Sequence, residues 1–261
     1  MTPGASVIVG AKIATRLVDV ERPWLWLSAG WRDLWRAPQV SLCYGLVFVV
    51  ISFLLTLGLW LAGLFYLLLP LAAGFMFLGP IIAVGLYDVS RRLERGERPS
   101  LAAAIGAWRG NGSQLALLGL VLMLFLLAWI RIAFLIFALF FGGQPPAWDL
   151  LVNTIFFTVD GIPFLAVGTV AGGVLALMVF AISAVAPPLL MDRDIGAMEA
   201  IFASVSAVTR NWRVMLGWGA LIVLFMGAGL ATFYVGLIVT LPLIGHASWH
   251  AYRDLIVAEG A

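Results

Sequence analysis

The chain has 261 residues, of which 63% are hydrophobic and only 11% charged, and its formal net charge is +2. A soluble domain has about 25% charged residues and about half apolar residues, so this composition excludes an ordinary soluble protein and predicts one that resides in lipid. The single cysteine, Cys43, excludes an internal disulfide and a cysteine-based metal cage. The basic residues flank apolar runs, which favours a role in membrane topology over nucleic-acid binding.

Residues 1–23 have a short apolar stretch with late basic residues, which is not typical of a signal peptide. We expect a flexible cytoplasmic tail there, one membrane domain over residues 24–256, and a second short tail over residues 257–261.

Six apolar stretches of the membrane domain are long enough for membrane helices of about 20 residues. Tight turns near Trp60–Gly63 and Thr232–Tyr234 divide the two longest apolar regions. The predicted fold is therefore all-α, with six transmembrane helices in three hairpins. The spans cover residues of about 40–61, 64–87, 115–141, 162–191, 214–233 and 235–256.

The basic residues predict the orientation of these spans. All of them except Arg131 fall before the first span, after the last, or in the connectors that follow spans two and four, whereas the opposite connectors hold only Asp149 and Asp160 as charged residues. By the positive-inside rule, both termini face the cytoplasm. The predicted location is the inner membrane of a bacterium, with the lipid bilayer as the main partner.

Each hairpin follows an amphipathic segment that we expect to lie in the cytoplasmic interface: "WLWLSAGWRDLWRAPQ", "SLAAAIGAWRGNG" and "MEAIFASVSAVTRNW". The second and third align without gaps at an offset of 100 residues, so that Asn111 matches Asn211. In the first segment, the tryptophans at 24, 31 and 35 share a helical face with two leucines, and Asp33 is expected to turn away with Arg32 and Arg36. The pattern predicts a triplicated unit.

The even-numbered spans end alike, with proline followed by a polar run. Residues four and eight positions after the proline share one helical face. These positions hold Val84 and Asp88 in the first hairpin, Asp192 and Gly196 in the second, and His246 and His250 in the third. We expect the polar ends to converge on the cytoplasmic side. Gly168 and Gly172 at GxxxG spacing favour close helix packing in span four.

His246 and His250 are the only histidines, and Asp254 extends their helical face by one turn. Two imidazoles and a carboxylate at this spacing can bind a transition metal, and one histidine can be an axial haem ligand. The alternative is that Trp249 and Tyr252 mark an interfacial belt in which the histidines pack without any ligand, and the composition favours this interpretation. No cofactor is therefore expected, with haem or a transition metal as the alternative.

Arg131 lies within an apolar span, about ten residues from its outer end, which is roughly 15 Å of helix. A charge at that depth costs several kcal/mol unless it is paired or reaches the interface. Asp149 and Asp160 are the candidate partners for a structural ion pair. The alternative is that Arg131 binds an anionic group in a substrate or ion pathway.

The chain resembles an uncharacterised family of bacterial inner-membrane proteins, some of which carry a cytochrome c oxidase subunit label. The similar segments are "GWRDLWRAPQVSLCYGLVF", "MDRDIGAMEAIFASVSAVTRNWRVMLGW" and "LPLIGHASWHAYRDLI". The resemblance extends over nearly the whole chain and implies a six-span membrane protein. A catalytic oxidase subunit needs many histidines for its haems and copper, which this chain does not have.

No reaction chemistry is evident in the sequence, so we expect a protein that is not an enzyme. The first hypothesis is an accessory, assembly or lipid-organising factor for a respiratory or other membrane complex. The alternatives are a small-solute or ion transporter that uses Arg131, and a haem- or metal-binding membrane protein that uses His246 and His250.

Overall fold

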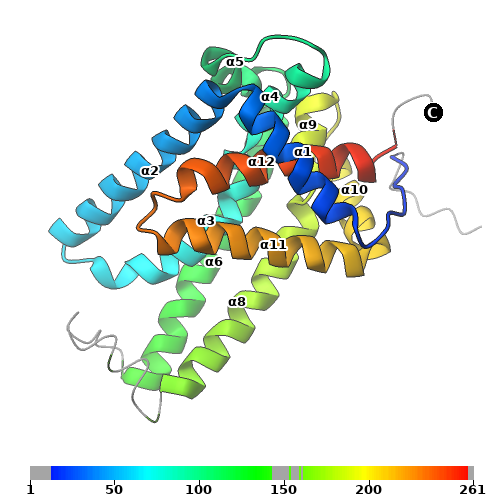
Figure 1. Ribbon diagram of the computed structural model, residues 1–261. Coiled ribbons are helices and arrows are strands. Elements are labelled where there is room, and N and C mark those ends of the chain that lie inside the picture. Colours follow the sequence, from blue (N-terminus) through cyan, green and yellow to red (C-terminus); the bar gives the residue numbers. More distant parts are fainter. Residues whose placement is uncertain (1–12, 143–152, 154–158, 160, 258–261) are drawn as a thin grey trace, which may run out of the picture.

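The computed structural model describes residues 13–142, 153, 159 and 161–257, and every named element within them is a helix. The order of the elements repeats, because a short helix precedes two long ones three times (Figure 1). The first unit contains α1 (Arg22–Arg36), α2 (Pro38–Leu61), η1 (Phe65–Leu67), α3 (Leu68–Ile82) and α4 (Val84–Glu94). The second contains α5 (Leu101–Gly106), η2 (Ala107–Arg109), α6 (Gly112–Phe141), α8 (Gly161–Ser183) and α9 (Ala186–Asp192). The third contains α10 (Ala197–Arg210), α11 (Trp212–Ala231) and α12 (Leu237–Leu255).

Five helical segments are long and apolar enough to cross a membrane, as judged by length and composition over the described residues. They are Pro38–Leu61, Phe65–Glu94, Gly112–Phe141, Gly161–Asp192 and Trp212–Ala231. Their bounds agree with the first five predicted spans to within a few residues at most ends, so the apolar runs located these helices well. The second segment begins and ends later than the prediction, because α4 continues into its polar run.

The sixth predicted span, α12, is not among these five. Its residues from Leu241 to Trp249 are all buried, and it packs against α1, α2, α4 and α11. A helix that is enclosed by other helices meets little lipid, so its sequence can be more polar than that of a lipid-facing span. The polar composition of α12 thus follows from its central position.

Proline interrupts two of the three returning helices. The second segment breaks at Ala83, three residues after Pro80, and α8 gives way to α9 before Pro187 and Pro188. Proline lacks an N–H and clashes with the carbonyl four residues earlier, which explains why α8 ends before Pro187 and Pro188. Helix α12 continues through Pro242 without a break.

Helix α1 lies across α12, and the two approach most closely at Gly30. A Cβ atom at this position would lie 2.6 Å from the backbone nitrogen of Ala247, so only glycine fits. The buried face of α1 includes Leu27, Asp33 and Leu34, whereas Trp24, Trp31 and Trp35 are exposed. The expected face, with the three tryptophans and two leucines together and Asp33 turned away from them, is therefore wrong, because Asp33 docks inward with Leu27 and Leu34 while Trp24, Trp31 and Trp35 face outward.

The two ends of the described chain lie together. Thr15 and Ile256 form an isolated antiparallel bridge, with the Arg16 N–H donating to the Leu255 carbonyl at 2.8 Å and the Val257 N–H donating to the Ala14 carbonyl at 3.0 Å. Residues 13–16 of the predicted flexible tail are thus held by backbone hydrogen bonds. The other parts of the predicted tails, residues 1–12 and 258–261, lie outside the described residues.

Candidate functional site

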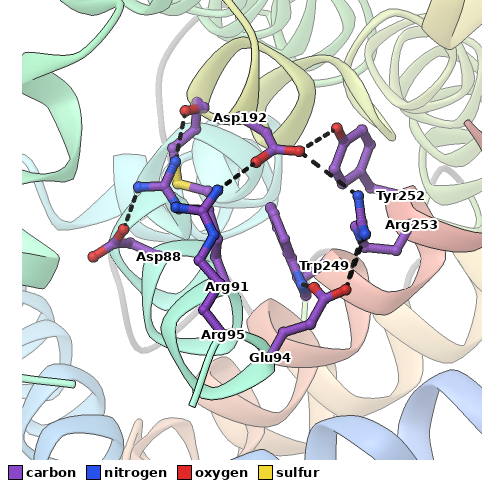
Figure 2. Close-up of polar contacts among 9 residues, drawn as sticks. Asp88, Arg91, Glu94, Arg95, Asp192, Trp249, Tyr252 and Arg253 are labelled. Atoms are coloured by element: carbon purple, nitrogen blue, oxygen red, sulfur yellow. Dashed lines mark hydrogen bonds and ion pairs between the residues drawn. The ribbon is translucent and has the colours of Figure 1, made fainter. Parts of the chain in front are cut away.

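Polar side chains from α4, α9 and α12 meet at one end of the helices, which we call the inner end (Figure 2). Asp192 of α9 accepts a hydrogen bond from the Tyr252 hydroxyl at 2.8 Å and lies 3.7 Å from Arg95 and 3.9 Å from Arg253. Arg253 also pairs with Glu94 at 3.0 Å. We call this cluster, with Asp88, Arg91 and Trp249, the inner network. It joins the returning helices of all three units, as the aligned helix ends predicted.

Asp88 is the most deeply buried carboxylate of the inner network, with 1% of its surface exposed. It pairs with Arg91 and with Arg92, whose Nε lies 2.7 Å from its oxygen. Arg91 in turn donates to the Met191 carbonyl of α9 at 3.0 Å. A buried carboxylate is stable only when paired, so this arrangement fixes α4 against α9.

His246 is fully buried, and both of its ring nitrogens have partners. Nε2 lies 2.9 Å from the Ser41 hydroxyl of α2, and Nδ1 lies 2.8 Å from the Ser90 hydroxyl of α4. One hydroxyl donates to the ring and the other accepts, whichever tautomer is present. The histidine therefore connects α12 to two other helices and has no free nitrogen for a metal.

His250 lies one turn further along α12, and its Nε2 is 2.7 Å from an Asp33 oxygen of α1. Burial raises the pKa of Asp33, but the hydrogen bond and charge of His250, together with a hydrogen bond from Ser90, outweigh it. The net pKa of Asp33 is lower than usual, so the carboxylate stays ionised against the histidine. We call Ser41, Ser90, Asp33, His246 and His250 the histidine chain.

Asp254, the third residue of the predicted metal face, also turns toward α1. It accepts a hydrogen bond from the Trp26 indole at 3.0 Å and lies 3.6 Å from Arg22. Each of the three polar residues on this face of α12 thus has its own partner. Within the described residues, no group of three His, Cys, Asp or Glu side chains could hold a metal ion.

Arg131 projects from the face of α6 opposite to its packed face and is exposed. It forms no hydrogen bond or ion pair with any described residue. Its candidate partners Asp149 and Asp160 lie outside the described residues, so the predicted ion pair stays a prediction. Two residues away, the Trp129 indole donates to the Pro70 carbonyl at 2.8 Å, which places this part of α6 beside the outer start of α3.

The two asparagines that align in the sequence, Asn111 and Asn211, have matching roles in the structure. Their alignment suggested a shared role but did not show what that role is. Asn111, just before α6, donates to the Arg193 and Ile195 carbonyls, and Asn211, just before α11, donates to the Arg16 carbonyl. Each thus holds an extended segment against the start of a long helix. Ser41 and Ser90 gave no signal in the sequence, because single serines in helices are common and their partner lies far away in the chain.

Comparison with known proteins adds the family context. Residues 68–192, from the start of α3 to the end of α9, match the family model described as "Predicted integral membrane protein (DUF2189)". No curated protein and no solved structure matches the chain. The matched region is shorter than the region of resemblance described above. Both comparisons, however, point to a family of uncharacterised membrane proteins. The chain is therefore an integral membrane protein whose central region matches a family of unknown function.

Proposed function

We propose that the protein is a non-catalytic, lipid-organising protein of a bacterial inner membrane, with six spans and both termini in the cytoplasm. The observation that carries this proposal is the outer face of α1. Trp24, Trp31 and Trp35 are all exposed there, and Arg32 and Arg36 lie among them. Tryptophan and arginine together are typical of a helix at headgroup depth, where the rings enter the interface and the charges meet lipid phosphates.

The sixth crossing is supported by the pairing of the chain ends. Five crossings would leave the start and end of the chain on opposite faces of the membrane, yet Thr15 pairs with Ile256. The turn before α12 lies beside the outer part of α2, because the Tyr234 hydroxyl is 2.9 Å from the Thr56 hydroxyl. Helix α12 therefore runs the length of α2 back to the inner end, enclosed by protein.

The orientation is supported by the charges at the inner end. Arginines of α4 and α12 gather there with those of α1 and α10, and basic residues are retained on the cytoplasmic side. Arg131 stands apart from them. Trp129, two residues away, lies beside the outer start of α3, which supports a guanidinium that extends toward outer headgroups.

Solute transport through Arg131 has less support, because Arg131 is not among the residues that line the large cavity between the spans. Metal or haem binding has less support, because both nitrogens of His246 contact serine hydroxyls. His246 and His250 each have protein partners, which are the two serines and Asp33.

Lipid analysis of the purified protein tests the proposal. The full chain would be isolated in mild detergent, and its retained lipids compared with those of the source membrane by mass spectrometry. We expect anionic phospholipids to be enriched. The Arg32→Gln/Arg36→Gln variant should reduce that enrichment severalfold, since each basic residue near the surface contributes about 1 kcal/mol to anionic-lipid binding.

The matched control is Arg32→Lys/Arg36→Lys, which keeps both charges and should retain the enrichment. Equal lipid profiles for the glutamine variant and the wild type would contradict the proposal. Reporter tags at the two ends that signal from opposite faces of the membrane would contradict the six-span topology.

A further inference from the structure

A cavity of about 1090 Å³ lies among the membrane-spanning helices, with walls from α3, α6, α8, α11 and α12. Its volume is at the upper end of the range of about 300–1,000 Å³ found for ligand pockets. None of the described residues that line it is charged. An apolar cavity of this kind stays free of water and takes apolar ligands.

The cavity extends along most of the membrane-spanning length. Its lining runs along α8 from Phe164 to Ala184, which is about 30 Å of helix and matches the thickness of the hydrocarbon core. At the outer end it is lined by Tyr66 and Phe137, and at the inner end by Tyr87 and Ser248. Its shape therefore suits a long chain better than a compact molecule.

One side of the cavity lies between α8 and α11. These helices are close at the inner end, where a Cβ at Gly219 would lie 3.7 Å from the Phe180 ring. They diverge from there toward the outer end (Figure 1). Gly168 and Gly173 of α8 face the cavity, and a Cβ at either would meet nothing within 4 Å. Of the two glycines predicted to pack helices closely, Gly168 thus lines open space, whereas a Cβ at Gly172 would lie 3.0 Å from the Trp129 ring of α6.

Two hydroxyl-bearing side chains at the inner end have no partner. Tyr87 is 3% exposed and Ser248 is 8% exposed, both line the cavity, and neither side chain forms a hydrogen bond with any described residue. Both hydroxyls reach open space rather than being enclosed by protein atoms, and a polar group that faces an apolar cavity normally has a hydrogen-bond partner. A ligand oxygen in the cavity would provide the missing partner.

We propose that this cavity binds a neutral lipid, with its uncharged, oxygen-bearing head against Tyr87 and Ser248 and its apolar chain along α8. A phosphate head is disfavoured inside, because none of the cavity-lining side chains that the structure describes is cationic and could compensate its charge. This site is separate from the headgroup contacts of α1 and goes beyond the lipid-organising function proposed above.

Photo-crosslinking in lipid nanodiscs tests the inference. The probes are a diacylglycerol and a phosphatidylglycerol that carry the same diazirine acyl chain, and mass spectrometry maps the labelled peptides. We expect the diacylglycerol probe to label residues 164–184 more strongly than the phosphatidylglycerol probe does. Equal labelling by both probes would show that the cavity does not distinguish a neutral head from a phosphate head and would overturn the neutral-lipid assignment.

Two kinds of variant sharpen the result. Gly168→Leu/Gly173→Leu places two bulky side chains in the cavity, from positions where a Cβ meets nothing within 4 Å, and should suppress the labelling. Gly58→Leu adds one such side chain at an exposed, uncrowded position of α2 and should leave the labelling unchanged. Tyr87→Phe/Ser248→Ala removes hydroxyls that have no internal partner, so the fold should persist. Its binding of diacylglycerol should weaken by about threefold to tenfold per hydroxyl, the worth of one hydrogen bond.

Undiminished labelling in the cavity-filling variant, with an unchanged melting temperature, would overturn the proposal. The Arg32→Gln/Arg36→Gln variant separates the two hypotheses, because it should lose anionic-lipid enrichment while keeping diacylglycerol labelling. Either hypothesis can thus fail without the other.

Discussion

The inner and outer halves of this protein are stabilised in different ways. At the inner end, α1, α4, α9 and α12 are joined by the inner network and the histidine chain, and the apolar residues on their facing sides are buried. Toward the outer end, α8 and α11 diverge around a cavity. There, α6 and α3 are joined by one hydrogen bond, from the Trp129 indole to the Pro70 carbonyl, rather than by a network of charged groups. The comparison indicates a rigid inner platform from which the outer parts of the hairpins extend into lipid. Four substitutions test this difference.

The largest effect is expected from Asp88→Ala. This change leaves Arg91 and Arg92 without their buried carboxylate, and breaking a buried pair costs about 3–5 kcal/mol. Denaturant unfolding in detergent micelles measures the loss. Asp88→Asn, which keeps the shape and some hydrogen bonds, should lose less. An Asp88→Ala protein as stable as the wild type would show that the inner network does not stabilise the platform.

Gly30→Ala should cost about 1–3 kcal/mol, because the new Cβ would force α1 away from the Ala247 backbone. The control is Gly58→Ala on α2, where a Cβ meets nothing and the better helix propensity of alanine should be neutral or slightly stabilising. Thermal unfolding of both variants gives the comparison. Equal melting temperatures would contradict the close docking of α1 on α12.

Asp33→Asn tests the histidine chain through pH. A carboxyl whose pKa is lowered in the folded state stabilises the protein above its unfolded value of about 3.9, and this contribution is lost as the pH falls through the folded pKa. At neutral pH the variant should be about 1–3 kcal/mol less stable, as for other charged hydrogen bonds. The difference between the two proteins should shrink below about pH 4. A difference that stays constant from pH 7 to pH 3 would argue against an ionised Asp33 in contact with His250.

The smallest effect is expected in the outer half. Trp129→Phe keeps an aromatic ring but removes the hydrogen bond to the Pro70 carbonyl, and the loss of that bond costs about 1 kcal/mol. Micelle unfolding again provides the measurement. A loss as large as that of Asp88→Ala would mean that the two halves are equally important for stability.

The sequence predicted the helices better than their contacts. Apolar runs located the long helices, because lipid requires about 20 apolar residues per crossing. The aligned prolines correctly predicted that the polar ends of α4, α9 and α12 meet. The sequence could not show which side of α1 docks, since tryptophan occurs on both faces and the burial of Asp33 depends on a histidine more than 200 residues away.

The candidate sites were harder to predict for the same reason. His246 and His250 share a helical face, which suggested a common ligand, but α2, α4 and α1 each supply a separate partner. The cavity could not be recognised from any sequence pattern, because its position depends on where whole helices diverge. Tyr87 and Ser248 became notable only once their missing partners could be seen.

The contact between Thr15 and Ile256 has a consequence for how the polypeptide can be rearranged. Because these two positions are adjacent, the path of the described chain returns almost to its starting point, and it could be opened at another position instead. A short linker joining the present ends, with new ends in the exposed loop between Gly96 and Pro99, would give a circular permutant that retains every described helix. In such a permutant the second hairpin would be synthesised first, so the order of membrane insertion could be changed independently of the final packing.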